Sequence, residues 1–365
     1  MPLFRPVPTQ SARALAVALA APVTGCGAEL DVWTGAHIDY LSSPSLSVCT
    51  GTHRYVDDFV PFVSGELGLE LPSGLEYQWL DENDFEGAPC RESISGCSRK
   101  DIAYARGPSL LHEVVHTVTW TAGMNNHLFF TEGLAVAYDP WLGEGVGPRY
   151  TLAVGPGDPL PDPRLALDAG TDDLDYALAG SFVTFLLTRH GHGKFVSFSQ
   201  QLRNGDKLAS IQSSFQAVYG LDFDTEVDLF RFGTPCVDNS FSVRVYDCVA
   251  PEVAWEDDRW SFTAGMNCAD EGVVGGLGTG PATPSIRSVT FNVPATGQYT
   301  LSVEGNEGVV VQTGPCFGCP WIPGEVGVSA GGEVTAEFAA GPHYLRIRAL
   351  TDDSLDVRAV LRPVP

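Results

Sequence analysis

Residues 112–116 read His-Glu-Val-Val-His, and residues 131–135, a short way along the chain, read Thr-Glu-Gly-Leu-Ala. On an α-helix His112 and His116 lie four residues apart, so both imidazoles project from one face and can bind a single metal ion, with Glu113 beside them. Glu132 in the second stretch offers a third ligand. Together the two stretches predict a metal centre around which this part of the fold is organised.

The sequence around both stretches predicts two helices. Gly107-Pro108-Ser109 ends in a suitable N-cap residue, and apolar residues then surround the histidines: Leu110, Leu111, Val114, Val115 and Val118. Asn125-Asn126-His127 predicts a turn, and residues 128–138 read as a second helix that carries Glu132 near its start. Two antiparallel helices would bring both histidines and Glu132 to one point.

Two histidines and one carboxylate are the ligands expected of catalytic zinc. Three protein ligands leave a fourth position for water, whereas structural zinc usually takes four protein ligands rich in cysteine. Zinc lowers the pKa of its water to about 7, and Glu113 is placed to accept the proton and to pass it to a leaving amine. The alternative is that the histidines are ordinary helix residues and Glu132 is a solvated acid.

These residues resemble the gluzincin zinc metallopeptidases, in which a glutamate on the next helix is the third ligand. The resemblance covers about residues 52–232 and includes Glu-Gly-Leu-Ala at 132–135. It implies a zincin-like α+β domain, Zn²⁺ on His112, His116 and Glu132, Glu113 as general base, and a peptide or protein substrate. It also implies an edge strand against which the substrate lies extended, for which residues 101–106 are the candidate.

The chain also departs from known gluzincins. The interval between His116 and Glu132 is shorter than in thermolysin-like or aminopeptidase-N-type members. Val136 stands where thermolysin-like enzymes carry an acid, so the group that orients the histidines is not identified. The Gly-Ala-Met-Glu-Asn segment of aminopeptidase-N-type enzymes is absent upstream of the zinc helix. An endopeptidase is therefore favoured over an aminopeptidase.

A helical lobe is expected after the ligands, because residues 176–190 place apolar side chains at helical spacing and residues 195–202 and 208–219 continue the pattern. Gluzincins often supply a tyrosine or histidine from this lobe to stabilise the oxyanion, and Tyr176 is the candidate; its alternative role is core packing. Residues 140–175 predict a long surface loop. Its aspartates read as solvated, with calcium binding as the alternative: Asp168, Asp172, Asp173 and Asp175.

The amino terminus predicts export. Arg5 and Arg13 precede the apolar run at 14–23, and Val23-Thr24-Gly25-Cys26 resembles the lipobox of bacterial lipoproteins. That resemblance implies removal of residues 1–25 and attachment of the protein to a membrane surface through lipidated Cys26 in the bacterial cell envelope. The alternative is an ordinary secretory signal and a secreted protein.

Eight cysteines remain besides Cys26, an even number that fits disulfides in an oxidising compartment. Proximity suggests that Cys90 pairs with Cys97 and that Cys236 pairs with Cys248. For the Cys316-Phe317-Gly318-Cys319 run, a structural role is favoured over a redox or zinc site.

Composition and pattern bound the remaining possibilities. A net charge of -24 with 21 basic residues argues against nucleic acid as a partner. After about residue 240 apolar and polar residues alternate between Gly and Pro turns, which predicts an all-β domain resembling the jelly-roll or β-sandwich domains that follow secreted peptidases. We therefore expect a signal peptide at 1–25, a zincin-like domain at 26–238 and a β-sandwich at 239–365, which could contact glycan or cell wall.

Two functions of different class follow. The first is a zinc-dependent peptidase held outside the membrane. The alternative is a surface adhesion or glycan-binding lipoprotein whose peptidase-like domain is catalytically idle. The complete set of ligands and base favours the peptidase, because an idle copy is free to lose either.

Overall fold

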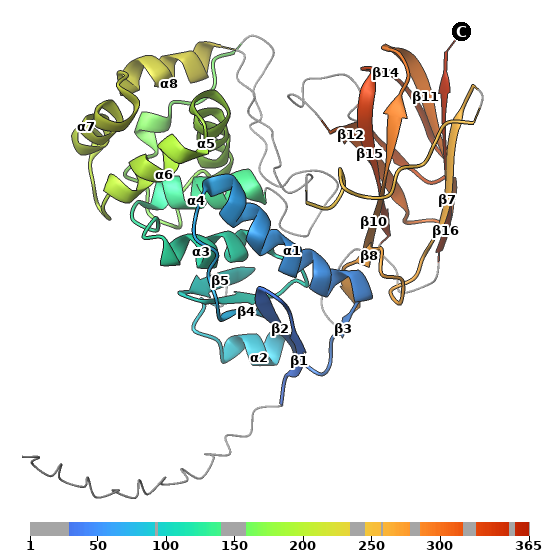
Figure 1. The fold of residues 1–365 in the computed structure, drawn as a ribbon, viewed down its shortest axis with the longest axis horizontal. Helices are drawn as coiled ribbons and strands as arrows, with labels where there is room; N and C mark the ends of the chain where they lie inside the picture. The colour runs from blue at the N-terminus through green and yellow to red at the C-terminus, as the bar shows by residue number, and fades with distance from the viewer. Residues whose placement is uncertain are drawn as a thin grey trace, which may run out of the picture.

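The computed structural model describes residues 29–91, 94–139, 158–233, 245–256, 258–277, 285–316, 326–349 and 355–364. They form a multidomain α+β structure with two separate buried apolar clusters, one in the helical part and one in a β-sandwich (Figure 1). The predicted signal segment with Cys26 and the predicted boundary at 238/239 lie outside the described residues.

A five-stranded mixed sheet opens the first part. Its order is β1 (Asp31–Thr34), β2 (Ile38–Ser42), β4 (Leu75–Trp79), β6 (Ile102–Ala105) and β5 (Gly96–Arg99). The three inner strands are parallel, and β1 and β5 pair antiparallel at the two ends. The expectation that residues 101–106 form the edge strand was wrong: this segment is β6, inside the sheet, and β5 is the edge among the described strands.

Helices cover the apolar face of this sheet. The first of them is α1 (Thr50–Leu67), which ends at Gly68 in the left-handed conformation. The short α2 (Glu82–Glu86) follows β4, and then come α3 (Leu111–Thr121) and α4 (Leu128–Tyr138). The core between the sheet and the helices α1 and α3 includes alternate residues of the strands, because successive side chains of a strand point to opposite faces: Ile38, Tyr40, Leu75, Tyr77, Trp79, Ala103 and Ala105.

The helical lobe that the sequence predicts is present. After the one-turn η1 (Pro163–Leu165) it comprises α5 (Tyr176–His190), α6 (His192–Gln201), α7 (Leu208–Tyr219) and α8 (Phe223–Phe232). Aromatic rings fill its centre in edge-to-face contacts, with Phe182 against Phe230 at 5.2 Å and Phe198 against Phe215 at 5.6 Å between centroids. Such contacts stabilise a packed core beyond simple area burial.

The β-sandwich predicted for the carboxyl-terminal part is also present. One sheet has the order β13 (Val326–Ser329), β12 (Val310–Pro315), β15 (Gly341–Ala349), β10 (Ser285–Val293) and β8 (Val273–Val274). The other has the order β14 (Glu333–Phe338), β11 (Gly297–Gly305), β16 (Leu355–Pro363) and β7 (Trp260–Met266). Inward-facing residues of both sheets form the second core.

The start of α1 is joined to the sandwich. Cys49 forms a disulfide with Cys268, and Thr52 Oγ1 donates to the carbonyl of Gly275 at 2.6 Å while accepting from its N–H at 2.8 Å. Just before α1, β3 (Ser47–Val48) pairs with β9 (Gly276–Leu277). Covalent, side-chain and main-chain bonds therefore hold the two parts together at one place (Figure 1).

The other disulfides test the expected pairing. Cys90 pairs with Cys97, as predicted, and ties the edge strand β5 to the segment before it. The pairing of Cys236 with Cys248 was wrong, because Cys248 bonds Cys316, 68 residues away, which sequence proximity could not reveal. This bond gives Cys316 the structural role expected of it. Disulfides of this kind indicate a protein that folds outside the cytoplasm.

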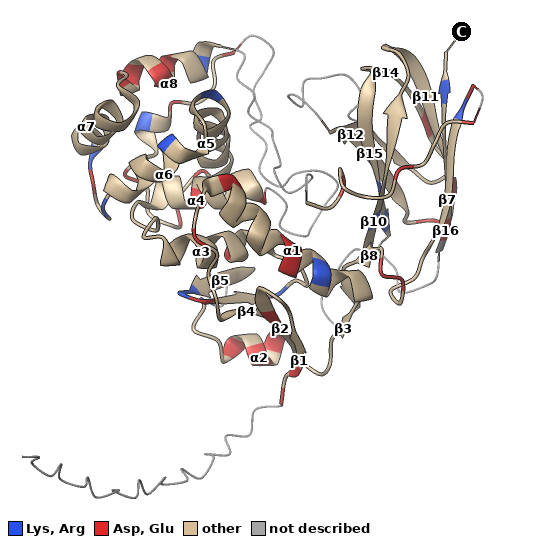
Figure 2. Cartoon of the chain, viewed as in Figure 1, with Lys and Arg blue, Asp and Glu red and all other residues tan. Residues whose placement is uncertain are grey.

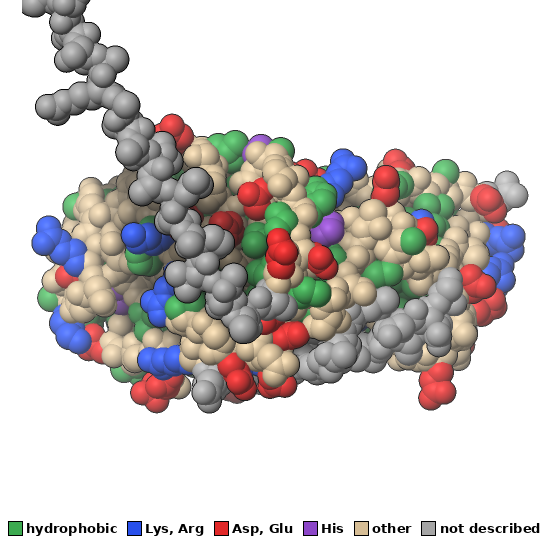
Figure 3. Space-filling view, turned by 90° about the horizontal axis from the view of Figure 1, so that it is seen from below, with side chains coloured by type: hydrophobic (Ala, Val, Ile, Leu, Met, Phe, Trp, Pro, Cys, Tyr) green, Lys and Arg blue, Asp and Glu red, His purple; other side chains and the backbone are tan. Residues whose placement is uncertain are grey.

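Charged side chains are dispersed over the described surface. Figure 2 shows acids along α2 and α8, and on the face in Figure 3 acidic and basic side chains are interspersed.

Two of the predicted loop acids pair with exposed cations, Asp172 with Arg91 and Asp168 with Lys207, while Asp175 caps α5. The group of described residues that could hold a metal ion does not include these aspartates and lies between α3 and α4. Among the same residues no helix has the length and apolarity needed to cross a bilayer.

Candidate functional site

His112 and His116 lie on α3 as predicted, but the helix does not begin at the predicted N-cap residue. Its N-cap residue is Leu110, whose side chain offers no capping bond, rather than Ser109. Two other elements satisfy the first N–H groups: Asp139 Oδ2 accepts from the N–H of His112 at 2.9 Å, and the Tyr77 hydroxyl accepts from the N–H of Leu110 at 2.7 Å. Capping from distant residues fixes where α3 begins.

The second helix, α4, follows the expected turn. Asn125 in this turn donates to the carbonyl of His116 at 3.2 Å and accepts from Thr119 Oγ1 at 2.9 Å, which ties the turn to the end of α3. His127 is the N-cap residue of α4 without a side-chain capping bond. The turn reverses the chain, so that Glu132 in the second turn of α4 faces α3.

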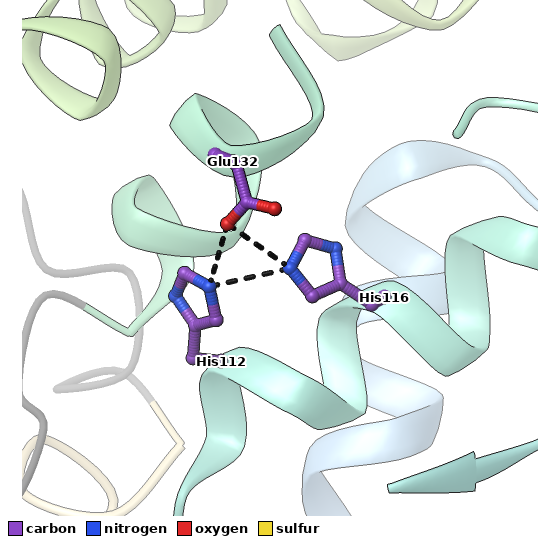
Figure 4. A group of neighbouring side chains, drawn as sticks. All are labelled: His112, His116 and Glu132. Atoms are coloured by element: carbon purple, nitrogen blue, oxygen red, sulfur yellow. Dashed lines mark hydrogen bonds and ion pairs between the residues drawn. The ribbon is translucent and has the colours of Figure 1, made fainter. Parts of the chain in front are cut away.

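His112, His116 and Glu132 converge (Figure 4). His112 Nε2 lies 3.1 Å from Glu132 Oε2 and 3.2 Å from His116 Nε2, and His116 Nε2 lies 3.4 Å from the same oxygen. The two histidines are buried, and the Glu132 side chain retains 16% exposure. Three ligand atoms therefore form a nearly equilateral triangle, and of the three side chains that of Glu132 is the most exposed.

The electrostatics of the triad are strongly coupled. Burial alone would lower the pKa of His116, but the Glu132 carboxylate and its hydrogen bond raise this pKa to about 9. Burial would raise the pKa of Glu132, yet the two imidazoles hold it well below its usual value. Without an ion the site thus keeps the Glu132 carboxylate beside a protonated His116 imidazole, a paired arrangement in which a bound cation would take the place of the proton.

Glu113 lies beside the triad on α3 and is 7% exposed. Burial raises the pKa of its carboxyl above the ordinary value; the imidazoles of His112 and His116 lower it in part, and Glu132 raises it again. A carboxyl whose pKa moves towards neutrality is suited to accept and return a proton.

The edge strand β5 approaches Glu113 closely at Gly96. A Cβ added at Gly96 would lie 3.0 Å from Glu113 Cγ and 2.6 Å from Leu110 Cδ2, so a glycine is required for this approach. Gly96 was not predicted from the sequence, where its only signal is a glycine within a short strand beside a cysteine. The strand that lies against the base is therefore β5 rather than the predicted 101–106 segment.

Tyr176 begins α5, and its ring centroid lies 6.3 Å from that of His112. Glycines on two helices allow this. A Cβ at Gly133 of α4 would meet the Ala179 carbonyl at 2.6 Å, and one at Gly180 of α5 would meet Val136 Cγ1 at 2.3 Å. The glycines in the Glu-Gly-Leu-Ala and Ala-Gly-Ser runs thus permit a close helix crossing that brings the start of α5 to the site.

The remaining histidines serve other contacts. His190 Nε2 lies 2.9 Å from buried Glu226 Oε2, and His192 lies 3.5 Å from Glu66. His127 packs on Phe130 with its Nε2 3.3 Å from the Asp206 carbonyl. Three further histidines pack against the rest of the molecule or occupy its surface: His37, His53 and His343.

No protein-family model and no curated protein matches the chain. Among solved structures, the pre-peptidase C-terminal domain of collagenase from Bacillus anthracis is 12% identical over 31% of this chain and 94% of its own, with a TM-score of 0.22. The lysozyme inhibitor PliG of Aeromonas hydrophila is 9% identical over 31% and 96%, with a TM-score of 0.22.

A carbohydrate-binding module from Cellvibrio mixtus lichenase 5A is 21% identical over 29% of this chain and 88% of its own, with a TM-score of 0.17. The β-sandwich is established by the strand pairing described above rather than by these likenesses. The gluzincin resemblance stays a prediction from the residues of the site.

Proposed function

We propose that the protein is an exported zinc-dependent peptidase in which His112, His116 and Glu132 hold the ion and Glu113 is the general base. The observation that carries this proposal is the triangle of donor atoms. Tetrahedral ligands at about 2.0–2.1 Å from one zinc ion lie roughly 3.3 Å from one another, and the three separations here are 3.1, 3.2 and 3.4 Å. Two imidazoles and a carboxylate are also a donor set that suits zinc.

When bound, zinc supplies a Lewis acid that polarises a substrate carbonyl and makes water a better nucleophile. Glu113 takes the proton from the attacking water and delivers it to the leaving amine, and its raised pKa favours this exchange. The Tyr176 hydroxyl is the proposed donor to the oxyanion. An extended peptide is proposed to pair with the outer edge of β5, on which none of the described strands pairs and which passes next to Glu113 at Gly96.

A direct test of this function is cleavage of a peptide library by the zinc-loaded protein, with new termini identified by mass spectrometry. We expect internal cuts rather than stepwise loss of amino-terminal residues, abolished by a chelator and restored by zinc. Stoichiometric zinc without any cleavage would support the idle, adhesive alternative instead. Attachment through lipidated Cys26 is part of the proposal, and the mass of the exported protein's first tryptic peptide tests it.

Zinc binding is expected to depend on pH through His116. Because the pKa of this ring is about 9 without the ion, the ring is protonated at neutral pH and zinc must displace the proton. The apparent affinity should therefore rise about tenfold per pH unit up to about pH 9 and level off above it. Calorimetry at pH 7.5 in buffers of different ionisation enthalpy should show release of between about one and two protons per zinc, one from His116 and the rest from the zinc-bound water; a release of less than about one proton would contradict the assignment of His116.

Replacing Tyr176 by phenylalanine should lower kcat by about 100-fold, the usual cost of removing one oxyanion donor. KM and zinc content should change little, because the ring that packs near His112 is retained. Tyr104→Phe, which removes a hydroxyl from β6, is the matched control. Steady-state kinetics on one library-derived peptide would decide, and an unchanged kcat in the Tyr176 variant would leave that residue with a packing role.

A further inference from the structure

Asp139 joins the helix that carries Glu132 to the helix that carries both histidines. It is the first residue after α4, it is 3% exposed, and its Oδ2 accepts from the main-chain N–H of His112 at 2.9 Å. Because Leu110 gives α3 no side-chain cap, the Asp139 carboxylate at the end of α4 caps this helix instead. A negative charge is also favourable at a helix N-terminus.

The contact lies at one end of a pair of helices that is also tied at the other. Asn125 in the connecting turn donates to the carbonyl of His116 at 3.2 Å, so α3 and α4 are joined there as well. The Tyr77 hydroxyl supports the same N-terminus as Asp139 by accepting from Leu110 and donating to the Gly107 carbonyl at 2.6 Å. Tyr77 comes from β4, however, and does not connect the two ligand helices.

We infer that Asp139 is the positioning residue of the metal site: its bond to His112 fixes the separation of α3 from α4 and thereby the distance of Glu132 from the histidines. This inference rests on the proposed zinc site. The bond reaches the main chain of a proposed ligand, so its loss moves the ligand itself. Outer groups that hold the side chains of metal ligands typically change metal affinity by about 10–100-fold when removed, and we expect a loss of this order for a group that holds a ligand's main chain.

The test compares three variants of the full exported protein. Asp139→Ala removes the acceptor, and Asp139→Asn keeps a carbonyl oxygen able to accept from His112. Asp222→Ala removes a cap of the same kind from α8, where the Asp222 side chain accepts from the N–H of Thr225 at 2.8 Å. Zinc affinity is measured by competition with a chelating dye, ligand geometry by the visible spectrum of the Co²⁺ form, and exchange of the His112 amide in the ion-free protein by NMR.

We expect Asp139→Ala to bind zinc about 10–100-fold more weakly, with an altered Co²⁺ spectrum and fast exchange of the His112 amide. Asp139→Asn should stay within a few-fold of wild type, and Asp222→Ala should melt earlier while keeping its affinity and spectrum. Wild-type affinity in Asp139→Ala, or equal losses in Asp139→Ala and Asp139→Asn, would overturn the inference. If the wild type bound no zinc, the proposed function would fall, and slow His112 exchange that becomes fast in Asp139→Ala would still support the positioning role.

Discussion

Replacing Glu113 by glutamine is expected to lower peptide cleavage by about 10²–10⁴-fold while leaving one zinc ion bound, since this is the range contributed by a general base. Glutamine keeps the shape of the side chain but cannot accept the proton of the attacking water. The close approach of Gly96 to Glu113 Cγ should tolerate the change, because no atom is added. Activity and zinc content are measured on the same samples, so a lost metal cannot be mistaken for a lost base.

The control for this variant is Glu82→Gln on α2, whose side chain is 82% exposed and pairs with Arg106 at the surface. It removes the same charge without touching the triad and should leave cleavage unchanged. Full activity in Glu113→Gln would show that another group takes the proton, and the proposed mechanism would then be wrong even if zinc were bound.

The second large effect concerns the ligands. His116→Ala and Glu132→Ala should each weaken zinc binding by more than about 100-fold, beyond the range seen when only a supporting group is removed. Each of the two residues holds one corner of the triangle: His116 Nε2 lies 3.4 Å from Glu132 Oε2 and 3.2 Å from His112 Nε2. Loss of either opens the triangle. Cleavage should fall in parallel with zinc occupancy, and added zinc should restore part of it.

His127→Ala is the matched control for the ligand variants. His127 is 5% exposed, as deeply buried as the two histidine ligands, and directly precedes the helix that carries Glu132, yet its ring faces Phe130 and the Asp206 carbonyl. Its removal should cost stability and leave the stoichiometry at one zinc per chain. Equal loss of zinc in this variant and in His116→Ala would mean that the affinity reports general damage to the fold.

The parts of the site that repeat with helical period could be predicted from the sequence. The four-residue spacing puts His112 and His116 on one face of a helix, with Glu113 beside them. The position of Glu132 follows from the apolar helix pattern around it. These are local properties. The separation of the two helices is set by contacts that the pattern does not contain, namely the Asp139 bond to His112 and the glycine crossing of α4 with α5.

The wrong predictions concern strands and cysteines whose partners are decided by the three-dimensional fold and not by nearness in the sequence. The 101–106 segment alternates as an edge strand would, but β5 pairs outside it, and alternation gives no information on strand order. Cys248 bonds Cys316 because β12 brings that cysteine near, while Cys236 is closer in sequence. Asp139 left only the weak signal of an acid that directly follows an apolar helix and precedes a proline.

The central claim, that one zinc ion is held between α3 and α4, is tested most directly by crystals of the zinc-loaded protein measured on both sides of the zinc absorption edge. We expect one anomalous peak within about 2.0–2.2 Å of His112 Nε2, His116 Nε2 and a Glu132 oxygen, with Glu113 facing the remaining position. A fully occupied peak elsewhere, or no peak at this triad in zinc-saturated crystals, would contradict it.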